Sequence, residues 1–193
     1  MTVKMISEQT SNMGANGIAL DAGIQYVTGA KDNLKFGISL KNVGPRISFT
    51  GDGLSFRGIV GDGDGYKMTI EQRSSELELP ALLNIGMSYD INMGLRNRIT
   101  GAGTFTSNSF QKDQYRLGGE YSYRDMFMFR LGYTYEKGIR DPSTRTTALR
   151  GPSGGFTIEL PMGENSSTFG LDYSYRHTDP FQGSHTIGVR INL

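Results

Sequence analysis

The chain has 193 residues, a formal net charge of +1 and no cysteine. Such a small net charge argues against a nucleic-acid-binding protein, and the missing thiols exclude both a disulfide framework and a thiolate metal site. No stretch approaches the ~18–20 apolar residues that a membrane helix needs. This does not exclude a membrane β-barrel, because each strand of such a barrel is only half apolar.

Apolar and polar side chains alternate with a period of two along much of the chain, which predicts β-strands with one apolar and one polar face. The 27 glycines and 20 Tyr and Phe residues agree with a β-structure rich in turns. A first, poorly patterned strand is expected at 3–8, followed by a loop at 10–17. Further strands are expected at 17–27, 34–43, 82–91, 97–106, 114–123, 126–137 and 156–160, with two more in 167–193.

The C-terminal segment 167–193 has the clearest alternation. Its first run places Phe169, Leu171, Tyr173 and Tyr175 on one face, and its second places Ile187, Val189, Ile191 and Leu193 on one face. About ten strands and no helix result, which predicts an all-β fold: an antiparallel up-and-down barrel occupying 1–193 as a single domain.

The connections between the expected strands give a second signal. Short turns at 28–33, 92–96, 124–125 and 161–167 alternate with medium or long connections, of which 44–80 and 138–153 are the longest. Bacterial outer-membrane barrels have short turns on the periplasmic side and longer loops outside. The alternation therefore favours the outer membrane over a soluble sandwich or a lipocalin-like barrel.

Three runs resemble the PorV/PorQ family, which are FadL-like outer-membrane barrels of the Bacteroidetes type IX secretion system. They are ANGIALDAGIQY, LKFGISLKNVGPRISF and YSYRHTDPFQGSHTIGVRINL. The resemblance covers nearly the whole chain but matches the C-terminal part of the family, whose members carry a signal peptide and further N-terminal strands. It implies that this chain is the later part of a fourteen-stranded barrel.

The resemblance also implies a function. PorV-type members are not enzymes; they bind the C-terminal domain of exported cargo and pass it to the attachment machinery at the cell surface. The expected partners are therefore cargo, other secretion-system proteins and outer-membrane lipid. Two alternatives stay open: a FadL-like transporter of hydrophobic small molecules, with a lateral opening near 101–103, and a small closed barrel with a packed interior.

Charged side chains alternate with the apolar ones and should face the inside of the barrel. Those expected to face the lumen are Arg116, Glu120, Arg130, Glu136, Asp172, Arg176 and Arg190, together with Asp21, Lys35, Lys41 and Asp90. Their signs nearly balance, which argues against a selective ion pore and favours pairing between neighbouring strands. Arg–Glu pairs between the strands at 114–123 and 126–137 are the specific expectation.

The connection 44–80 is the candidate partner-binding loop because apolar side chains interrupt an otherwise polar segment. They are Phe49, Leu54, Phe56, Ile59 and Tyr66, with Val60 beside them. Such groups either fill the lumen as a plug or bind another protein. Two parts of the segment, ISF and YKMTIEQ, are expected to pair as a β-extension.

No catalytic residue, metal site or cofactor is expected. The GDGDG run at 61–65 lacks the ligands of an EF-hand, since Tyr66 and Arg73 stand where oxygen ligands belong. His177 and His185 are the only histidines, and two imidazoles without a third ligand make a poor metal site. Both are expected at the rim of the last loop.

Overall fold

The computed structural model describes residues 1–61, 65–145, 147–162, 167–179 and 181–192. The first six strands are β1 (Thr2–Thr10), β2 (Met13–Thr28), β3 (Leu34–Val43), β4 (Ser55–Val60), β5 (Tyr66–Glu71) and β6 (Leu82–Met93). The others are β7 (Asn97–Asn108), β8 (Gln114–Tyr123), β9 (Phe127–Glu136), β10 (Leu149–Pro161), β11 (Thr168–Thr178) and β12 (Ser184–Asn192). One short 3-10 helix, Asp52–Leu54, precedes β4. Within the described ranges, no helix has the length and apolar character needed to cross a membrane.

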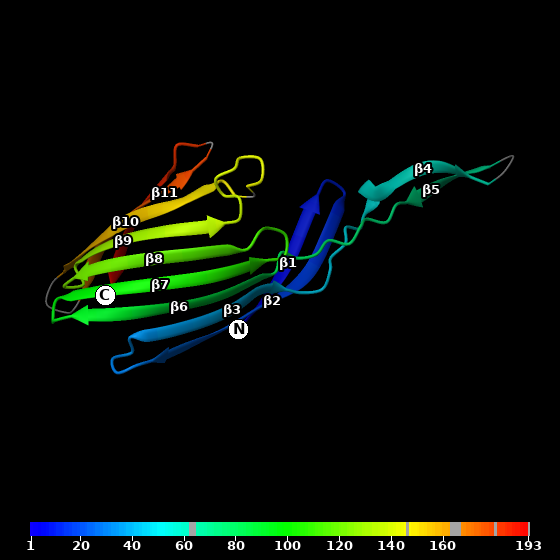
Figure 1. Ribbon diagram of the computed structural model, residues 1–193. Coiled ribbons are helices and arrows are strands. Elements are labelled where there is room, and N and C mark those ends of the chain that lie inside the picture. The colour runs from blue at the N-terminus through cyan, green and yellow to red at the C-terminus, as the bar shows by residue number, and fades with distance from the viewer. Residues whose placement is uncertain (62–64, 146, 163–166, 180, 193) are drawn as a thin grey trace. The chain divides into compact units, whose positions relative to one another are not determined.

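Ten of the strands form one sheet in the order β1-β2-β3-β6-β7-β8-β9-β10-β11-β12, and β4 pairs with β5 in a separate sheet (Figure 1). Every register that we describe below is antiparallel. The predictions of an all-β, antiparallel, up-and-down arrangement and of about ten strands are therefore confirmed. The order begins at β1 and ends at β12, so the described residues form no closed barrel.

Several boundaries differ from the sequence-based ones. β2 begins at Met13, inside the predicted loop 10–17, because β1 and β2 are joined by a two-residue turn in which Ser11 takes a left-handed backbone (φ 45°). β10 begins at Leu149, well inside the predicted loop 138–153. A register shift between Leu149 and Ser153 accommodates its irregular start, next to a proline and several glycines.

The predicted alternation of connection lengths holds only in part. The two longest connections, 44–81 and 137–148, do fall on the same end of the up-and-down order. The prediction is wrong at 11–12, which is a tight turn, and the connections 109–113 and 179–183 are no longer than 162–167 at the opposite end. A two-residue hairpin turn needs only residues that tolerate left-handed backbone, so it is easily mistaken for part of a loop.

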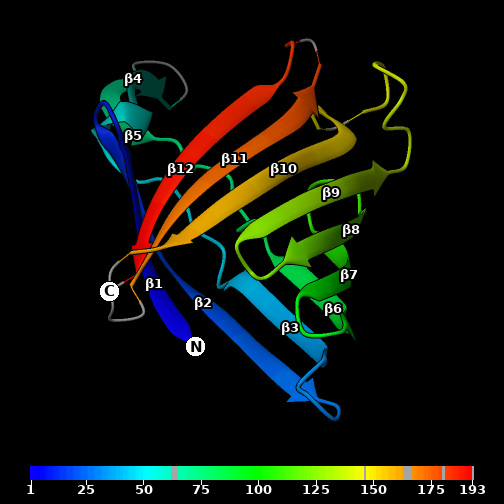
Figure 2. The same ribbon diagram turned by 90° about the vertical axis from the view of Figure 1, so that its left-hand side faces the viewer.

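The chain divides into two compact units, one of 1–23 and 39–82 and the other of 24–38 and 83–193. In the larger unit, β6 to β12 lie side by side in a curved layer (Figures 1 and 2). Lys35, Asp90, Arg98 and Glu159, from β3, β6, β7 and β10, line one common hollow. The side bearing these residues is called the inner face below, and the opposite side the outer face.

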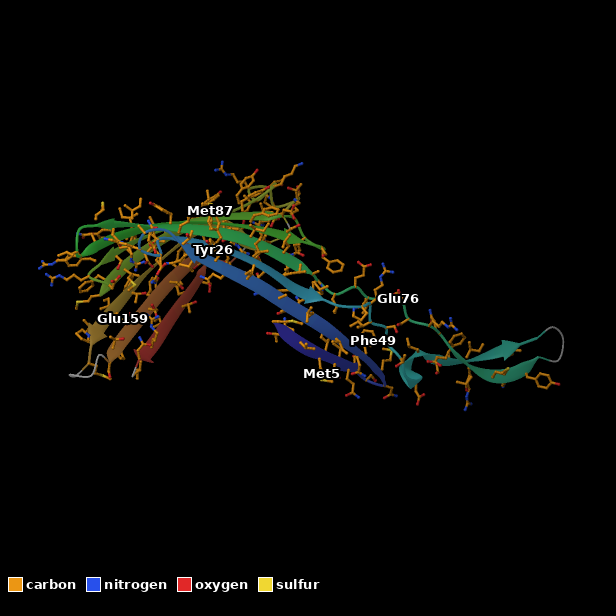
Figure 3. The ribbon with its side chains drawn as sticks, turned by 90° about the horizontal axis from the view of Figure 1, so that it is seen from below. Met5, Tyr26, Phe49, Glu76, Met87 and Glu159 are labelled. Carbon is orange, nitrogen blue, oxygen red and sulfur yellow. The ribbon has the colours of Figure 1, made fainter. Side chains whose placement is uncertain are left out.

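Burial in the larger unit is inverted relative to a water-soluble core. The outer face of β8 and β9 carries apolar and aromatic side chains that are all well exposed: Tyr115, Leu117, Tyr121, Phe127, Phe129, Leu131, Tyr133 and Tyr135. Apart from Ile139 in the connection 137–148, the buried side chains of this unit are instead polar and lie on the inner face: Asp90, Thr106, Gln114, Ser122, Glu136 and Thr157. Figure 3 shows the same contrast between Met87 on the outer side and Glu159 on the inner side.

In the smaller unit, the start of the long connection packs on the β1–β2 hairpin. Ala15 and Ala19 on β2 are almost fully buried, and so is Ile47 of the connection. Ile47 also exchanges two backbone hydrogen bonds with Leu77. Gly17 makes this packing possible, because a Cβ at that position would lie 2.4 Å from Cγ2 of Ile47.

We expect Gly17→Val to displace Ile47 and release the long connection from the hairpin. Limited proteolysis should then cut within 44–81 about ten times faster than in the unchanged protein, because local opening controls the cleavage rate. Gly101→Val is the matched control, since a Cβ at Gly101 has no neighbour within 4 Å. Equal cleavage of both variants would contradict the packing described for Ile47.

Candidate functional site

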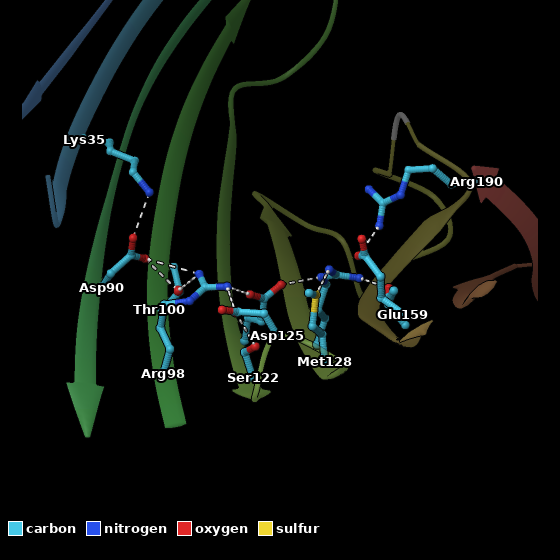
Figure 4. Close-up of polar contacts among 12 residues, drawn as sticks. Lys35, Asp90, Arg98, Thr100, Ser122, Asp125, Met128, Glu159 and Arg190 are labelled. Atoms are coloured by element: carbon cyan, nitrogen blue, oxygen red, sulfur yellow. Dashed lines mark hydrogen bonds and ion pairs between the residues drawn. The ribbon is translucent and has the colours of Figure 1, made fainter. Parts of the chain in front are cut away.

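The inner face of the larger unit carries a ladder of polar contacts that crosses strand after strand (Figure 4). It starts on β3, where Nζ of Lys35 lies 2.7 Å from Oδ2 of Asp90 on β6. The other oxygen of Asp90 accepts a hydrogen bond of 2.6 Å from the Thr100 hydroxyl on β7. Each contact joins neighbouring strands of the sheet, so the side chains reinforce the backbone pairing.

Arg98 on β7 connects three carboxylates. Its guanidinium lies 3.0 Å from Asp125 in the β8–β9 turn, 3.4 Å from Glu120 on β8 and 4.0 Å from Asp90. The planar guanidinium offers five N–H donors, so one side chain serves several carboxylates at once. Asp125 also accepts a hydrogen bond from Ser122, at 2.9 Å.

The Arg98 and Ser122 hydrogen bonds hold the pKa of Asp125 below its ordinary value, in that order of importance. Both bonds favour the ionised carboxylate, whereas partial burial acts against it. Asp125 therefore stays negatively charged in the turn at neutral pH and keeps its ion pair with Arg98 at this end of the ladder.

Arg130 on β9 continues the ladder towards the C-terminus. Its Nε donates to Oε2 of Glu120 at 2.6 Å, and its Nη1 donates to the Thr157 hydroxyl on β10, also at 2.6 Å. Thr157 in turn donates to Asp172 on β11. Seven strands from β3 to β11 are thus connected through side chains.

A second crossing links β10 with β12. Arg190 lies 3.1 Å from Glu159, although β11 runs between their strands. Gly170 stands opposite both residues on β11, and the Arg190 side chain passes over the space where its Cβ would be. Glycine at this position therefore gives the long side chain its path to Glu159.

The ladder borders a hollow of about 470 Å³ at the end of the sheet that holds the β6–β7 and β8–β9 turns. Cationic and anionic groups both line it: Lys31, Lys35, Arg98, Asp90, Asp125 and Glu159. The near balance of signs agrees with a braced wall and gives no ring of one charge that would select ions.

The expected Arg–Glu pairing is confirmed for Glu120 and Arg130, which stand directly opposite each other on β8 and β9. Arg116 and Glu136 are linked through Gln114, which accepts from Arg116 at 2.9 Å and donates to Glu136 at 3.1 Å. Asp172 and Arg190 also lie in the ladder. The Arg176 side chain forms no hydrogen bond or ion pair in the part of the chain that the structure describes.

Sequence reasoning missed two central residues, Arg98 and Glu159. The glycines at 101 and 103 obscured the register of β7, but Ile99 and Phe105 share the outer face, which places Arg98 on the inner one. Glu159 alternates with Ile158 and Leu160 and could have been assigned to the inner face in the same way. Both assignments needed only the alternation of a neighbouring apolar pair.

The candidate partner-binding residues do not form one surface. Phe49 and Leu54 are half-buried, whereas Phe56, Ile59 and Tyr66 are well exposed on the β4–β5 hairpin. The register pairs Phe56 with Ile70 and Gly58 with Met68, so Phe56, Tyr66, Met68 and Ile70 share one face and Ile59 lies on the other. The predicted pairing of ISF with YKMTIEQ is wrong, because β5 pairs with β4 and Ile47 bridges to Leu77 instead.

The two histidines lie on the outer face of the last hairpin, each bonded to a tyrosine. His185 Nδ1 is 2.8 Å from the Tyr173 hydroxyl, and His177 Nδ1 is 3.1 Å from that of Tyr175. Among the described residues, no three His, Cys, Asp or Glu side chains gather as a metal site would require. The centre of the GDGDG run, 62–64, lies outside the described residues.

Comparisons with models of protein families, with curated proteins and with solved structures gave no match, so the function has to be argued from the geometry.

Breaking the Glu120–Arg130 pair should weaken the sheet in a way that exchanging the two charges reverses. We expect Arg130→Gln and Glu120→Gln each to lower the free energy of unfolding by about 1 kcal/mol, because both groups are partly exposed. The double exchange Glu120→Arg with Arg130→Glu should recover about half of that loss. Urea unfolding followed by circular dichroism measures the free energy of unfolding of each variant.

Lys67→Gln on the separate β4–β5 hairpin is the control for the simple loss of a positive charge. If the exchanged variant is less stable than either single variant, the two side chains do not stabilise the sheet as a pair.

Proposed function

We propose that this chain forms the wall of a non-enzymatic β-barrel in the bacterial outer membrane. The single observation that carries the proposal is the inverted burial of the larger unit, with aromatic and aliphatic side chains outside and charged ladders inside. A single-layered sheet has no second layer to cover such an outer face, and in water each Å² of it would cost about 25 cal/mol. Lipid hydrocarbon removes that cost.

Apolar side chains are exposed along the length of a strand and not only at one point of it. On β12, Ile187, Val189 and Ile191 are 73%, 63% and 57% exposed. A soluble protein rarely exposes a continuous apolar surface of this extent unless something covers it. The aromatic residues of β8 and β9 also suit a membrane, because tyrosine can place its ring in lipid and its hydroxyl at the headgroups.

β1 and β12, the two strands at the ends of the ten-stranded sheet, bear on this proposal. An unpaired strand edge in lipid leaves backbone N–H and C=O groups without partners, which is very costly. In the membrane, β1 and β12 must therefore pair, either with each other or with further strands of a larger, fourteen-stranded barrel. The family resemblance favours further strands.

For the biological role we propose a shuttle or anchor for exported proteins in the type IX secretion system. This part rests on the three runs that resemble the PorV/PorQ family, together with the exposed apolar face of the β4–β5 hairpin. A transporter of hydrophobic molecules is the alternative. It gains less support, because polar groups line the hollow described above and the pairing of β7 with β8 continues unbroken through Gly101 and Gly103.

Removing the β4–β5 hairpin tests the role of the loop. Leu54 and Gln72 are joined by a backbone hydrogen bond of 2.9 Å at the base of the hairpin, so an Asn-Gly turn can replace 55–71. The ten-stranded sheet does not include the hairpin, so we expect the variant to fold and insert normally. Its affinity for the C-terminal domain of an exported protein should fall about a hundredfold, as measured by biolayer interferometry.

Phe56→Ser with Met68→Ser should reproduce about a tenfold loss by removing two apolar groups from one face of the hairpin. Thr69→Ser on the opposite face is the control. If the unchanged protein does not bind the domain, or the shortened variant binds equally well, the shuttle role is wrong even though the membrane location can still hold.

A further inference from the structure

A second hollow, of about 490 Å³, lies over β9 to β12 and differs from the ladder in its chemistry. The inner-face residues that line it are small or hydroxylated, apart from its charged groups. Asp172 stands at one end and Arg176 at the other, and Arg130 stands opposite Gly155 between them, with its guanidinium bonded to Thr157 beside Asp172. Neither the wall nor the loop described above explains this arrangement.

The strand registers place the lining side chains in three cross-strand rows. In the first row, Ser153, Arg176 and Ser184 stand opposite one another on β10, β11 and β12. In the second row the residues are Gly155, Ser174 and Thr186. In the third row Asp172 and Gly188 line the hollow, and Thr157 stands opposite Asp172 on β10 without lining it. Directly opposed residues have Cβ atoms about 4.5–5.5 Å apart, so a serine hydroxyl lies within reach on each side of Arg176.

The first row has donors without partners. Within the described residues, Arg176, Ser153 and Ser184 form no side-chain hydrogen bond or ion pair, whereas the other charges on this face of β8 to β12 are engaged. A guanidinium flanked by two hydroxyls is suited to a carboxylate, phosphate or sulfate, since it offers parallel N–H donors to two oxygens. The donors of this row are therefore available to bind a ligand in exchange for water.

The opposite end of the hollow offers an acceptor. Asp172 receives the Thr157 hydroxyl, which Arg130 also contacts, so the carboxylate is fixed in place. Asp172 and Arg176 are four residues apart on one strand, which separates their Cα atoms by about 13 Å. Between Asp172 and Arg176, no side chain on β10 fills the hollow at Gly155. This position is restricted to glycine, because a Cβ there would lie 2.5 Å from the Tyr173 carbonyl oxygen.

We propose that this hollow binds an acidic saccharide, with its anionic group on Arg176, Ser153 and Ser184. The sugar hydroxyls then lie over the second row and donate to Asp172 in the third. A volume of about 490 Å³ is within the range of small-molecule sites. The same anionic sugar can come free in solution or as the head group of a glycolipid.

Calorimetry on the purified chain in detergent tests the proposal with glucuronate, glucose 6-phosphate, glucose and inorganic phosphate. We expect both acidic sugars to bind about tenfold or more tightly than glucose and than phosphate alone. A micelle-borne phosphorylated glycolipid separates the two sources: tighter binding of the glycolipid than of the free sugar phosphate identifies a lipid head group, and equal binding of the two identifies a soluble ligand.

Two substitutions act on the site in different ways. Arg176→Gln should weaken acidic sugars about tenfold or more without changing glucose, and Arg176→Lys should recover part of the loss. Gly188→Leu should abolish binding by filling the hollow, because a Cβ there meets only Cβ of Asp172, at 3.6 Å. Arg116→Gln, which removes an inner-face arginine bonded to Gln114, should leave binding unchanged.

Circular dichroism melting of each variant separates loss of the site from loss of the fold. The proposal is overturned if acidic and neutral sugars bind equally, if phosphate alone binds as tightly as the sugar phosphate, if folded Arg176→Gln behaves like Arg116→Gln, or if no acidic sugar or glycolipid binds at millimolar concentration.

Discussion

The cross-strand ladder on the inner face is the interaction on which the larger unit depends. A single-layered sheet cannot be stabilised by packing two apolar faces together, as a sandwich is. Here the charged groups hold one another across the strands, from Lys35 and Asp90 to Arg130 and Asp172, through Arg98, Glu120 and Thr157. Because they satisfy one another, no polar group has to be placed on the outer face.

The ladder also explains how the hollows arise. Long charged side chains reach across the sheet only where their neighbours are small, as Arg190 does over Gly170. Where small residues continue without a bridging arginine, as in the rows around Ser174, the inner face is left open. The same pattern of glycine and serine therefore serves both the bracing of the wall and the proposed saccharide site.

Alternation in the sequence predicted most of the sheet, because a strand with two chemically different faces leaves a period of two that needs no tertiary knowledge. β3 and β8 were predicted to the residue, and the Glu120–Arg130 pair followed from their register across a short turn. The failures have local causes. Glycines carried no facial information on β7, and the turn at Ser11 depended on a left-handed backbone that serine adopts only occasionally.

The contacts inside the hollows were beyond sequence reasoning for a different reason. Which arginine is paired and which is free depends on the register of three strands at once. β10 begins at Leu149, earlier than the predicted 156, and this brings Ser153 into the strand opposite Arg176. The β4–β5 hairpin was likewise not predicted, because β4 (Ser55–Val60) was interpreted as apolar residues that interrupt a loop. The long connection thus contains more order than its composition suggests.

The membrane location of the outer face is the central claim, and the absence of cysteine makes it directly measurable. Single cysteines along β9, from Phe127 to Glu136, can carry nitroxide labels in the protein reconstituted into vesicles, where paramagnetic oxygen reports lipid and a nickel chelate reports water. We predict alternation: labels at Phe127, Phe129, Leu131, Tyr133 and Tyr135 should be accessible to oxygen and shielded from the chelate, and labels at the intervening positions should not share that pattern. Equal access of the chelate to both sets would contradict the membrane account.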